Sequence, residues 1–492
     1  MIIGGLDVGT TGCKIALYDE QATLLDTYYQ EYAVTHQNGQ HEINFCDIRN
    51  GVLGLLKQAV GTYRLDALGV TSFGETFAML DENDEVLSSS MLYTDPRGSE
   101  ECAALCEALG EENLTLLTGV KPHAMYSISK MMWHKAHNPD LFVRCRRILL
   151  GEDFVVYTLT GNAQIDYSLA ARTAAFDVEK KAYIPQVFEA AGIDMALMSR
   201  PVPAGTIAGE ITPVVQALLG IDYTFTVVSA CHDQVSAMIG AGVFEPAQAM
   251  DGTGTVECIP VLLEEKPRDL AFYAGGYAVV PFLGDRYACY ALSFTGGATL
   301  KWFRDTFAEE EAARAAQNGE NIYALLDSRV PTAPTDILVL PHFAGAATPY
   351  MDNDAKAAFV GVTLETDKYA LYKALMEGTS YEMLLNFRTL RAFTQNITEI
   401  RATGGGATSD VWLQIKADIL DTAITALSCK EVGAAGTAAM AGLAVGAYTD
   451  LAATVAKMAT VRRTFTPDPA RRAIYAEQYE KYANLYTAVK NL

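Results

Sequence analysis

One carboxylate stands in the middle of a segment built almost entirely of small and apolar residues. The segment reads Val-Val-Ser-Ala-Cys-His-Asp-Gln-Val-Ser-Ala-Met-Ile-Gly-Ala-Gly over 227–242, and its one acidic residue is Asp233. Burying an ionised carboxylate is costly unless it is paired, hydrogen-bonded or protonated. Asp233 therefore either has a structural role, such as capping a helix, or serves acid-base chemistry. The segment alone favours the structural reading and leaves the chemical one open.

Two loops rich in glycine and threonine, each beginning with an aspartate, form a second chemical feature. They are Asp7-Val-Gly-Thr-Thr-Gly12 and Asp251-Gly-Thr-Gly-Thr255. Backbone amides and hydroxyls in such turns can surround phosphate oxygens, and the aspartate can hold magnesium directly or through water. The sequence contains no Gly-Lys dipeptide for a Walker A loop, no Gly-x-Gly-x-x-Gly after a strand and no Gly-x-Ser-x-Gly. We therefore expect a nucleotide clamp made of two hairpin loops.

The elements that must position these loops read as alternating strands and helices. Strands are predicted over 2–6, 13–18, 23–29 and 67–71, and helices over 48–62 and 100–109. In the second half, helices are predicted over 411–420 and 433–446, and four tyrosines from Tyr475 to Tyr486 at helical spacing indicate packing. Strand, helix and strand in succession favour an α/β fold.

Near residue 245 the pattern starts again, because the second Asp-Gly-Thr loop repeats the logic of the first: an apolar lead-in, an aspartate, glycine with threonine, then another strand. The repeat predicts an internal duplication. We expect an N-terminal domain over 1–244 and a C-terminal domain over 245–492.

The composition of the chain excludes several classes of binding partner. The formal net charge is -22 over 492 residues, which argues against nucleic acid as a partner. The longest uncharged run, Val432–Thr449, is too rich in alanine and glycine for a membrane span. Nine cysteines without a Cys-x-x-Cys motif fit reduced thiols, and we expect a cytoplasmic protein without a membrane partner. His134 and His137 lack a second ligand pair at zinc spacing and are not expected to bind metal.

The whole chain resembles the FGGY carbohydrate kinases of the actin and hexokinase superfamily. The resemblance rests on the order and spacing of many short segments, each weak alone. They are Gly5-Leu-Asp-Val-Gly-Thr-Thr11, Gly69-Val-Thr-Ser-Phe-Gly-Glu75, Tyr93-Thr-Asp-Pro-Arg97, Lys130-Met-Met-Trp133, Gly151-Glu-Asp-Phe154, His232-Asp-Gln234, Asp251-Gly-Thr-Gly-Thr255, Gly296-Gly-Ala-Thr-Leu-Lys-Trp302, Pro341-His-Phe-Ala-Gly345, Glu377-Gly378 and Gly404-Gly-Gly406. It implies an α/β fold of two duplicated ribonuclease H-like (actin/hexokinase-type) domains with an ATP cleft between them.

The resemblance also assigns roles on the nucleotide side. It implies that Asp233 is the general base and that Asp7 is the magnesium-associated carboxylate. The expected contacts to ATP and its phosphates are Asp7, Gly9, Thr10, Thr11, Gly12, Lys14, Thr253, Gly254, Gly297, Gly405, Gly406 and Asp410. The implied cofactors are ATP and Mg²⁺.

On the acceptor side the resemblance points to Glu75, Tyr93, Arg97, Asp233 and Gln234. It implies an ATP-dependent kinase that transfers the γ-phosphate to a hydroxyl of a ketose or related polyhydroxylated compound, with a pentulose such as xylulose favoured. A glycerol- or erythritol-type polyol kinase is the alternative, and an actin- or chaperone-like ATP switch is a distant one. A homodimer is compatible with the resemblance, and His232 is expected to pack beside Asp233 rather than tune it.

Overall fold

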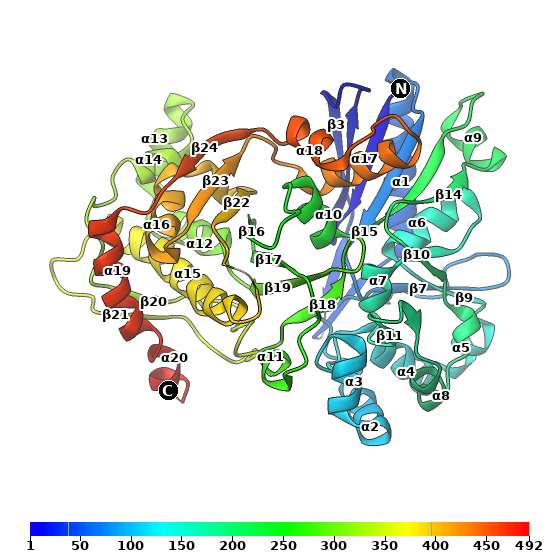
Figure 1. Cartoon of the computed structure of the whole chain (residues 1–492), viewed down its shortest axis with the longest axis horizontal. Helices are drawn as coiled ribbons and strands as arrows, with labels where there is room; N and C mark the ends of the chain where they lie inside the picture. The colour runs from blue at the N-terminus through cyan, green and yellow to red at the C-terminus, as the bar shows by residue number, and fades with distance from the viewer. Residues whose placement is uncertain (38, 395, 492) are drawn as a thin grey trace.

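The computed structural model describes residues 1–37, 39–394 and 396–491 and contains two α/β domains, each built on one central sheet (Figure 1). The first sheet has the strand order β14-β15-β6-β1-β2-β3. Its strands are β14 (Thr206–Glu210), β15 (Thr226–His232), β6 (Ala67–Ser72), β1 (Ile3–Val8), β2 (Gly12–Tyr18) and β3 (Leu24–Glu31). Strands β15, β6 and β1 run parallel, and β14, β2 and β3 are antiparallel to their neighbours.

The second sheet repeats this pattern. Its order is β18-β19-β17-β16-β22-β23-β24. The strands are β18 (Ala278–Pro281), β19 (Tyr287–Ser293), β17 (Glu257–Leu263), β16 (Gln248–Thr253), β22 (Glu399–Thr403), β23 (Ala423–Leu427) and β24 (Val461–Phe465). Here β16, β22 and β23 are parallel, and β17, β19 and β24 are antiparallel to their neighbours. The duplication predicted from the two aspartate loops is therefore present in the topology, with β1–β2 matching β16–β17.

Helices cover both sheets, and short strand pairs complete the loops. The helices of the first half are α1 (Phe45–Thr62), α2 (Ser99–Leu109), α3 (Glu111–Thr118), α4 (Ser127–His137), α5 (Pro139–Arg144), α6 (Gly151–Thr160), α7 (Tyr167–Ala171), α8 (Pro185–Ala191), α9 (Pro213–Leu219) and α10 (Asp233–Gly240). Those of the second half are α11 (Leu270–Ala274), α12 (Gly297–Phe307), α13 (Glu309–Asn318), α14 (Ile322–Asp327), α15 (Lys368–Arg391), α16 (Asp410–Leu420), α17 (Val432–Ala444), α18 (Leu451–Met458), α19 (Pro469–Tyr482) and α20 (Leu485–Val489). The short strands are β4 (Val34–Gln37), β5 (Gln40–Ile43), β7 (Phe77–Leu80), β8 (Ser90–Met91), β9 (Arg147–Leu150), β10 (Gln164–Asp166), β11 (Phe176–Asp177), β12 (Ala182–Tyr183), β13 (Arg200–Val202), β20 (Leu338–Leu340) and β21 (Ala358–Val360).

Capping residues explain where the predicted helices begin. The helix expected from residue 48 starts at Phe45, because the Asn44 side chain accepts a hydrogen bond from the Cys46 amide. The helix expected from residue 411 starts at Asp410, where the Ser409 side chain accepts from the Trp412 amide. The C-terminal tyrosine stripe is a packing feature as predicted, since Tyr475 and two of its helical neighbours are buried.

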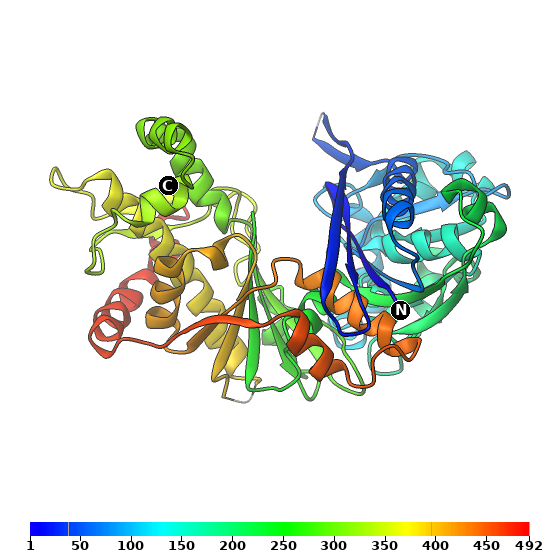
Figure 2. The ribbon, with the colours of Figure 1, turned by 90° about the horizontal axis from the view of Figure 1, so that it is seen from above.

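Helix α17 joins the two halves of the chain. It comes from the C-terminal half but packs against β1 and β6 of the first sheet and crosses α10 (Figure 2). The crossing is close because a Cβ at Gly240 would overlap the Val432 carbonyl and one at Gly436 would overlap the Ser236 carbonyl. Although the expected boundary at residue 244 falls between α10 and β16, the C-terminal half thus supplies one layer of the first domain.

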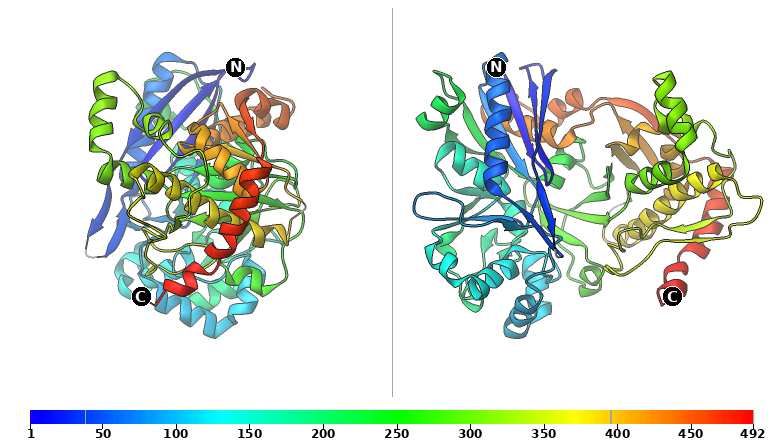
Figure 3. Two further views of the ribbon diagram at one scale, coloured as in Figure 1. Left: turned by 90° about the vertical axis from the view of Figure 1, so that its left-hand side faces the viewer. Right: turned by 180° about the vertical axis from the view of Figure 1, so that it is seen from behind.

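The two ends of the chain lie in different domains, the N-terminus beside the first sheet and the C-terminus after α20 on the far side of the second (Figure 3). Among the described residues, no helix is both long enough and apolar enough to cross a membrane.

Candidate active site

Asp233 lies at the carboxyl end of β15, in the first turn of α10. The N-cap position belongs to His232, so Asp233 is the first residue of the helix rather than its cap. The side chain is 27% exposed. In open α/β sheets, ligands bind outside the carboxyl ends of the strands. Asp233 is therefore placed where a reacting group would sit.

The surroundings of Asp233 suit a proton acceptor. Burial raises the pKa of its carboxyl to about 8, and the nearby negative charges of Asp7 and Glu75 add to the rise. The Gln234 amide and the Arg172 charge oppose it. A carboxyl tuned towards neutral pH by burial and like charges is typical of a general base.

His232 lies directly against the Asp233 carboxylate, as packing beside it requires; the expectation that it does not tune the carboxyl stays a prediction. Its Nε2 approaches Asp233 Oδ1 within 3.2 Å, but too obliquely for a hydrogen bond, and Oδ1 is buried without a donor from any residue that the structure describes. Burial lowers the pKa of His232 well below its ordinary value, so the ring is neutral.

The first aspartate loop is a tight turn at the tip of the β1–β2 hairpin. The Gly9 amide donates to the Gly12 carbonyl across the turn at 2.9 Å. Thr10 and Thr11 at the tip are half-buried and exposed, respectively. Lys14 stands opposite Asp7 in the strand register and forms an ion pair with Glu431, the residue before α17. The lysine is thus tied to the interdomain helix.

Asp7 has the properties of a magnesium-associated carboxylate. Burial raises its pKa to about 6, against the lowering effect of Lys14, and its oxygens accept no hydrogen bond from the described residues. Across the described chain, no group of three or more His, Cys, Asp or Glu side chains is placed to hold a metal ion. Mg²⁺ commonly binds through one or two carboxylates together with substrate phosphates and water. A single free carboxylate beside a phosphate loop fits that pattern.

The second aspartate loop departs from the expectation at Thr253. Its hydroxyl is buried and receives a hydrogen bond from Lys416 Nζ at 2.6 Å, while it donates to Asp251 Oδ1 at 2.9 Å. The side chain therefore faces the interior rather than a phosphate, and the exposed Gly254 and Thr255 remain for that contact. Lys416 also pairs with Asp251 at 2.5 Å and Glu257 at 2.6 Å, so one buried ammonium holds both strands of the hairpin.

The glycines around this loop serve two purposes. Gly297 begins α12 and donates its amide to the Gly254 carbonyl at 2.8 Å. A Cβ at Gly297 would meet that carbonyl and one at Gly406 would meet Thr253, so both are needed for packing against the loop. Gly405 has open space around its Cα. Among Gly297, Gly405 and Gly406, Gly405 is the one where absence of a side chain leaves room for a ligand.

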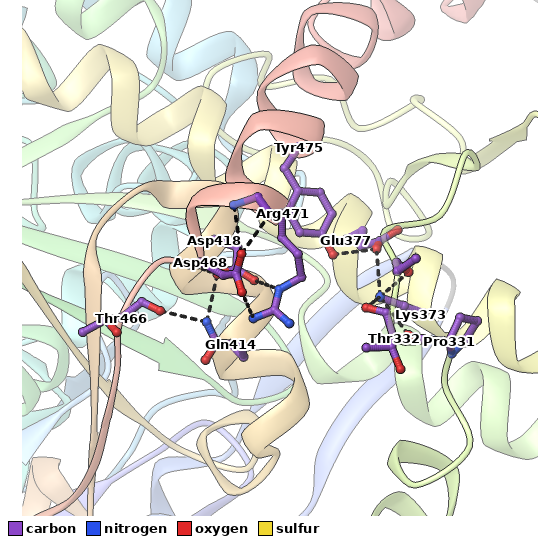
Figure 4. A network of polar contacts seen from close by, with 12 residues as sticks. Pro331, Thr332, Lys373, Glu377, Gln414, Asp418, Thr466, Asp468, Arg471 and Tyr475 are labelled. Atoms are coloured by element: carbon purple, nitrogen blue, oxygen red, sulfur yellow. Dashed lines mark hydrogen bonds and ion pairs between the residues drawn. The ribbon is translucent and has the colours of Figure 1, made fainter.

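The Asp410 carboxylate is already paired with two arginines. Its two carboxylate oxygens accept from Arg462 at 2.8 Å and Arg463 at 2.7 Å. A cavity of about 420 Å³ lies beside it, and its charged lining is internally paired, including Arg471 with Asp418 (Figure 4). Lys373 in the same wall donates to the carbonyls of 331–333. This network ties α15, α16 and α19 together behind the second phosphate loop.

On the acceptor side, Glu75 forms a buried ion pair with Arg172. Arg172 Nε lies 2.6 Å from Glu75 Oε1, and Nη2 contacts the same oxygen. Glu75 has φ 64°, a left-handed conformation that non-glycine residues adopt at functional sites more than elsewhere. Tyr93 lies near both Glu75 and Asp233, since their charges contribute to raising its pKa after burial. Gln234 follows Asp233 on α10 and is half-buried.

Arg97 pairs with two carboxylates and lies over a tryptophan ring. It donates to Asp95 Oδ1 at 2.8 Å and to Glu42 Oε1 at 2.6 Å, and it stacks on Trp133 at 5.0 Å. Its Nε and Nη2 are therefore held by these two carboxylates, and the expected contact of Arg97 with a substrate stays a prediction.

Sequence reasoning missed three residues of the site: Arg172, Tyr290 and Lys416. Arg172 directly follows α7, Tyr290 lies on β19, and Lys416 lies on α16, whose first residue Asp410 was expected at the site; no local pattern singles out any of the three. The available signal is the position of a basic residue in an apolar helix, as for Lys416 in Trp-Leu-Gln-Ile-Lys-Ala. A buried lysine requires buried acid partners.

Models of a known protein family match most of the chain. The N-terminal domain model of the FGGY family of carbohydrate kinases matches residues 2–240, and the C-terminal domain model matches residues 252–445. The xylulose kinase of Bacillus subtilis is 25% identical, with the match covering 99% of this chain and 97% of that protein.

Two solved structures share the fold. A ligand-bound xylulose kinase from Lactobacillus acidophilus superposes with a TM-score of 0.90 at 21% identity, over 99% of this chain and 98% of that one. A Plasmodium falciparum glycerol kinase with ADP superposes with a TM-score of 0.86 at 19% identity, over 98% of this chain and 97% of that one. The predicted two-domain α/β fold is confirmed.

Proposed function

The chain belongs to the FGGY family of carbohydrate kinases, and we propose that it phosphorylates a ketose, with a pentulose such as xylulose as the favoured acceptor and Asp233 as the general base. Enzymatic phosphoryl transfer from ATP to a carbohydrate hydroxyl follows from the family. The acceptor and the roles of individual residues are the proposed part.

The placement of Asp233 carries the proposal. Its carboxyl lies at the end of a parallel strand and is partly exposed, and its pKa is raised. Among the described residues, no donor forms a hydrogen bond to its Oδ1. In the proposed reaction the carboxylate accepts the proton of the acceptor hydroxyl as that oxygen attacks the γ-phosphate. A structural acid in this position would be expected to have a partner.

The two hairpin tips supply the nucleotide contacts in this proposal. The backbone of Gly9–Gly12 and of Gly254 would surround the phosphates, and Gly405 would lie against the nucleoside. Asp7 would hold Mg²⁺, which when bound neutralises charge on the transferring phosphoryl group. Lys14 would contribute positive charge near the phosphates, and its ion pair with Glu431 would link this charge to the start of α17.

On the acceptor side, Glu75 would accept hydrogen bonds from sugar hydroxyls through Oε2, because Arg172 occupies Oε1. Tyr93 would lie against the carbon chain, and Gln234 would bind a further hydroxyl. This arrangement of acceptors and amides suits a polyhydroxylated compound. A cytoplasmic location belongs to the proposal too, supported by nine cysteines that are all free thiols and by the requirement for ATP.

A coupled ATP-consumption screen with pentuloses, hexuloses, glycerol and erythritol tests the acceptor. The proposal predicts the highest kcat/KM for a pentulose. A preference for glycerol or erythritol would replace it with the polyol alternative. ATP hydrolysis that no acceptor stimulates would indicate an ATP switch without sugar chemistry.

A further inference from the structure

Tyr290 belongs to the second sheet but its side chain reaches into the acceptor site of the first domain. It lies on β19, is 7% exposed and belongs to the apolar cluster shared by both domains. Its hydroxyl is 3.3 Å from His232 Nδ1, and the two rings are 5.8 Å apart between centroids. The Arg172 guanidinium lies 5.7 Å from the centroid of the same tyrosine ring. One side chain thus contacts both the neighbour of the base and the partner of Glu75.

The Tyr290 hydroxyl can select one of the two neutral tautomers of His232 by donating to Nδ1. The imidazole is neutral and therefore has one N–H. Burial raises the pKa of Tyr290 far above its ordinary value, so its hydroxyl keeps its proton and can donate. When that hydroxyl donates to Nδ1, the imidazole proton must reside on Nε2, the nitrogen that faces Asp233 Oδ1 at 3.2 Å.

Asp233 Oδ1 accepts no hydrogen bond from the part of the chain that the structure describes, and the Nε2–H tautomer of His232 would provide a donor next to it. It is a buried carboxylate oxygen without a hydrogen bond from the described residues, and the nearest N–H group on this assignment is His232 Nε2. Hydrogen bonds at catalytic groups are often poorly aligned before substrates bind and tighten afterwards. A small rotation of the imidazole or the carboxylate would align this one and leave Oδ2 for the acceptor hydroxyl.

We propose that Tyr290 and His232 are positioning residues for the general base: the Tyr290 hydroxyl holds His232 in its Nε2–H tautomer, and that N–H orients the Asp233 carboxylate for proton transfer. This inference rests on the proposed role of Asp233. Because Tyr290 comes from the second domain and His232 from the first, the base is fully oriented only while the two domains keep the contact seen here.

Tyr290→Phe tests the inference, because it removes one hydroxyl and keeps the ring that packs against Arg172. We expect kcat to fall about tenfold, the rate equivalent of one lost hydrogen bond, while both KM values stay within about twofold. Tyr287→Phe, on the same strand and outside the site, is the matched control and should behave as wild type. A Tyr290→Phe kcat within about twofold of wild type would overturn the inference.

A double variant separates positioning from packing. His232→Gln keeps an N–H donor near the place of Nε2 but needs no tyrosine to set its tautomer, so it should retain more activity than His232→Ala. Adding Tyr290→Phe to His232→Gln should not lower kcat further, because the Tyr290 hydroxyl is proposed to act only through the His232 tautomer. A full additional loss in the double variant would show that the Tyr290 hydroxyl acts independently of His232 and would overturn the inference.

Nitrogen-15 NMR of labelled histidine provides a readout that does not need turnover. The wild-type protein should show the His232 signals of a neutral Nε2–H imidazole, assigned by their absence in His232→Gln, and Tyr290→Phe should populate the other tautomer. An Nδ1–H imidazole in the wild type would contradict the inference even if the enzyme is active. Lack of turnover with every acceptor, alongside the expected tautomer, would instead count against the proposed function.

Discussion

Arg172 Nε lies 2.6 Å from Glu75 Oε1, and these side chains are only 7% and 4% exposed. A buried charge that loses its partner destabilises a protein more than the intact pair stabilises it. The pair therefore couples acceptor binding to the integrity of the first domain, and its two members should respond differently to substitution.

Arg172→Met should lower the free energy of unfolding by about 3–5 kcal/mol, because Glu75 is left buried and unpaired. The double variant Arg172→Met with Glu75→Gln should recover part of that loss. Urea denaturation of the three proteins at one pH measures both effects. A loss in the single variant of less than about 1 kcal/mol, the size expected of an exposed pair, would show that the ion pair is not desolvated.

Glu75→Gln alone should act on the acceptor rather than on ATP. The amide keeps the shape of the side chain but replaces a charged acceptor by a neutral one, which weakens hydrogen bonds from sugar hydroxyls. We expect the KM for the acceptor to rise about tenfold and the KM for ATP to remain near wild type. Steady-state kinetics with each substrate varied in turn measures the two KM values. Equal changes in the KM for the acceptor and the KM for ATP would place Glu75 outside the acceptor site.

Lys416 should set the affinity for ATP from behind the second phosphate loop. Lys416→Met leaves Asp251 and Glu257 buried without their shared cation and frees the loop hairpin. We expect kcat/KM for ATP to fall about tenfold or more, as when an outer positioning group is removed, with KM for the acceptor less affected. Lys457→Met, an exposed lysine on α18, is the control. An unchanged ATP dependence in folded Lys416→Met would remove Lys416 from the loop's support.

Two helical glycines provide a matched test of the interdomain crossing. Gly436 on α17 touches α10, whereas Gly54 on α1 has nothing within 4 Å of an added Cβ. Gly436→Ala should destabilise the protein by about 1–3 kcal/mol through overpacking, and Gly54→Ala should stabilise it by about 0.5–1 kcal/mol. Thermal denaturation compares them. Equal shifts in the two melting temperatures would mean that the crossing tolerates a wider separation.

The sequence predicted the parts of this protein that are local in the chain. The two aspartate loops, their strands and most helix positions follow from composition and spacing, because turn residues and apolar periodicity act over a few residues. The duplication was visible for the same reason: Asp7 and Asp251 each lie near the end of the first strand of a hairpin.

Side-chain direction and long-range pairing could not be read in this way. Thr253 lies in a phosphate-type loop but points inward, because Lys416, 163 positions later, supplies its partner. Arg97 comes shortly after Tyr93 in the chain, and its guanidinium pairs with Asp95 and with Glu42, which lies 55 positions earlier. Helix α17 packs on the opposite domain from the strands that precede it. Each outcome depends on a partner distant in sequence.

The raised pKa of Asp233 predicts that this residue makes the stability of the folded protein depend on pH. Its folded-state pKa is about 8 against an ordinary value of 3.8, so between those values the folded protein binds one more proton than the unfolded chain at this site. This contribution makes wild-type stability fall as pH rises through that window and level off above about pH 8. Asp233→Asn has no such dependence. Its melting temperature relative to wild type should therefore increase from about pH 5 to about pH 9, while a constant difference would contradict burial as the cause.

The most direct test of the central claim is phosphoryl transfer by Asp233→Asn with the acceptor that the wild type prefers. Asparagine preserves size but cannot accept the hydroxyl proton. We predict that kcat falls by about 100-fold or more, within the range typical of a lost general base, while ADP binds within about threefold of wild type by calorimetry. Transfer within about tenfold of wild type, by a variant that is folded and binds ADP, would contradict the assignment of Asp233 as the base.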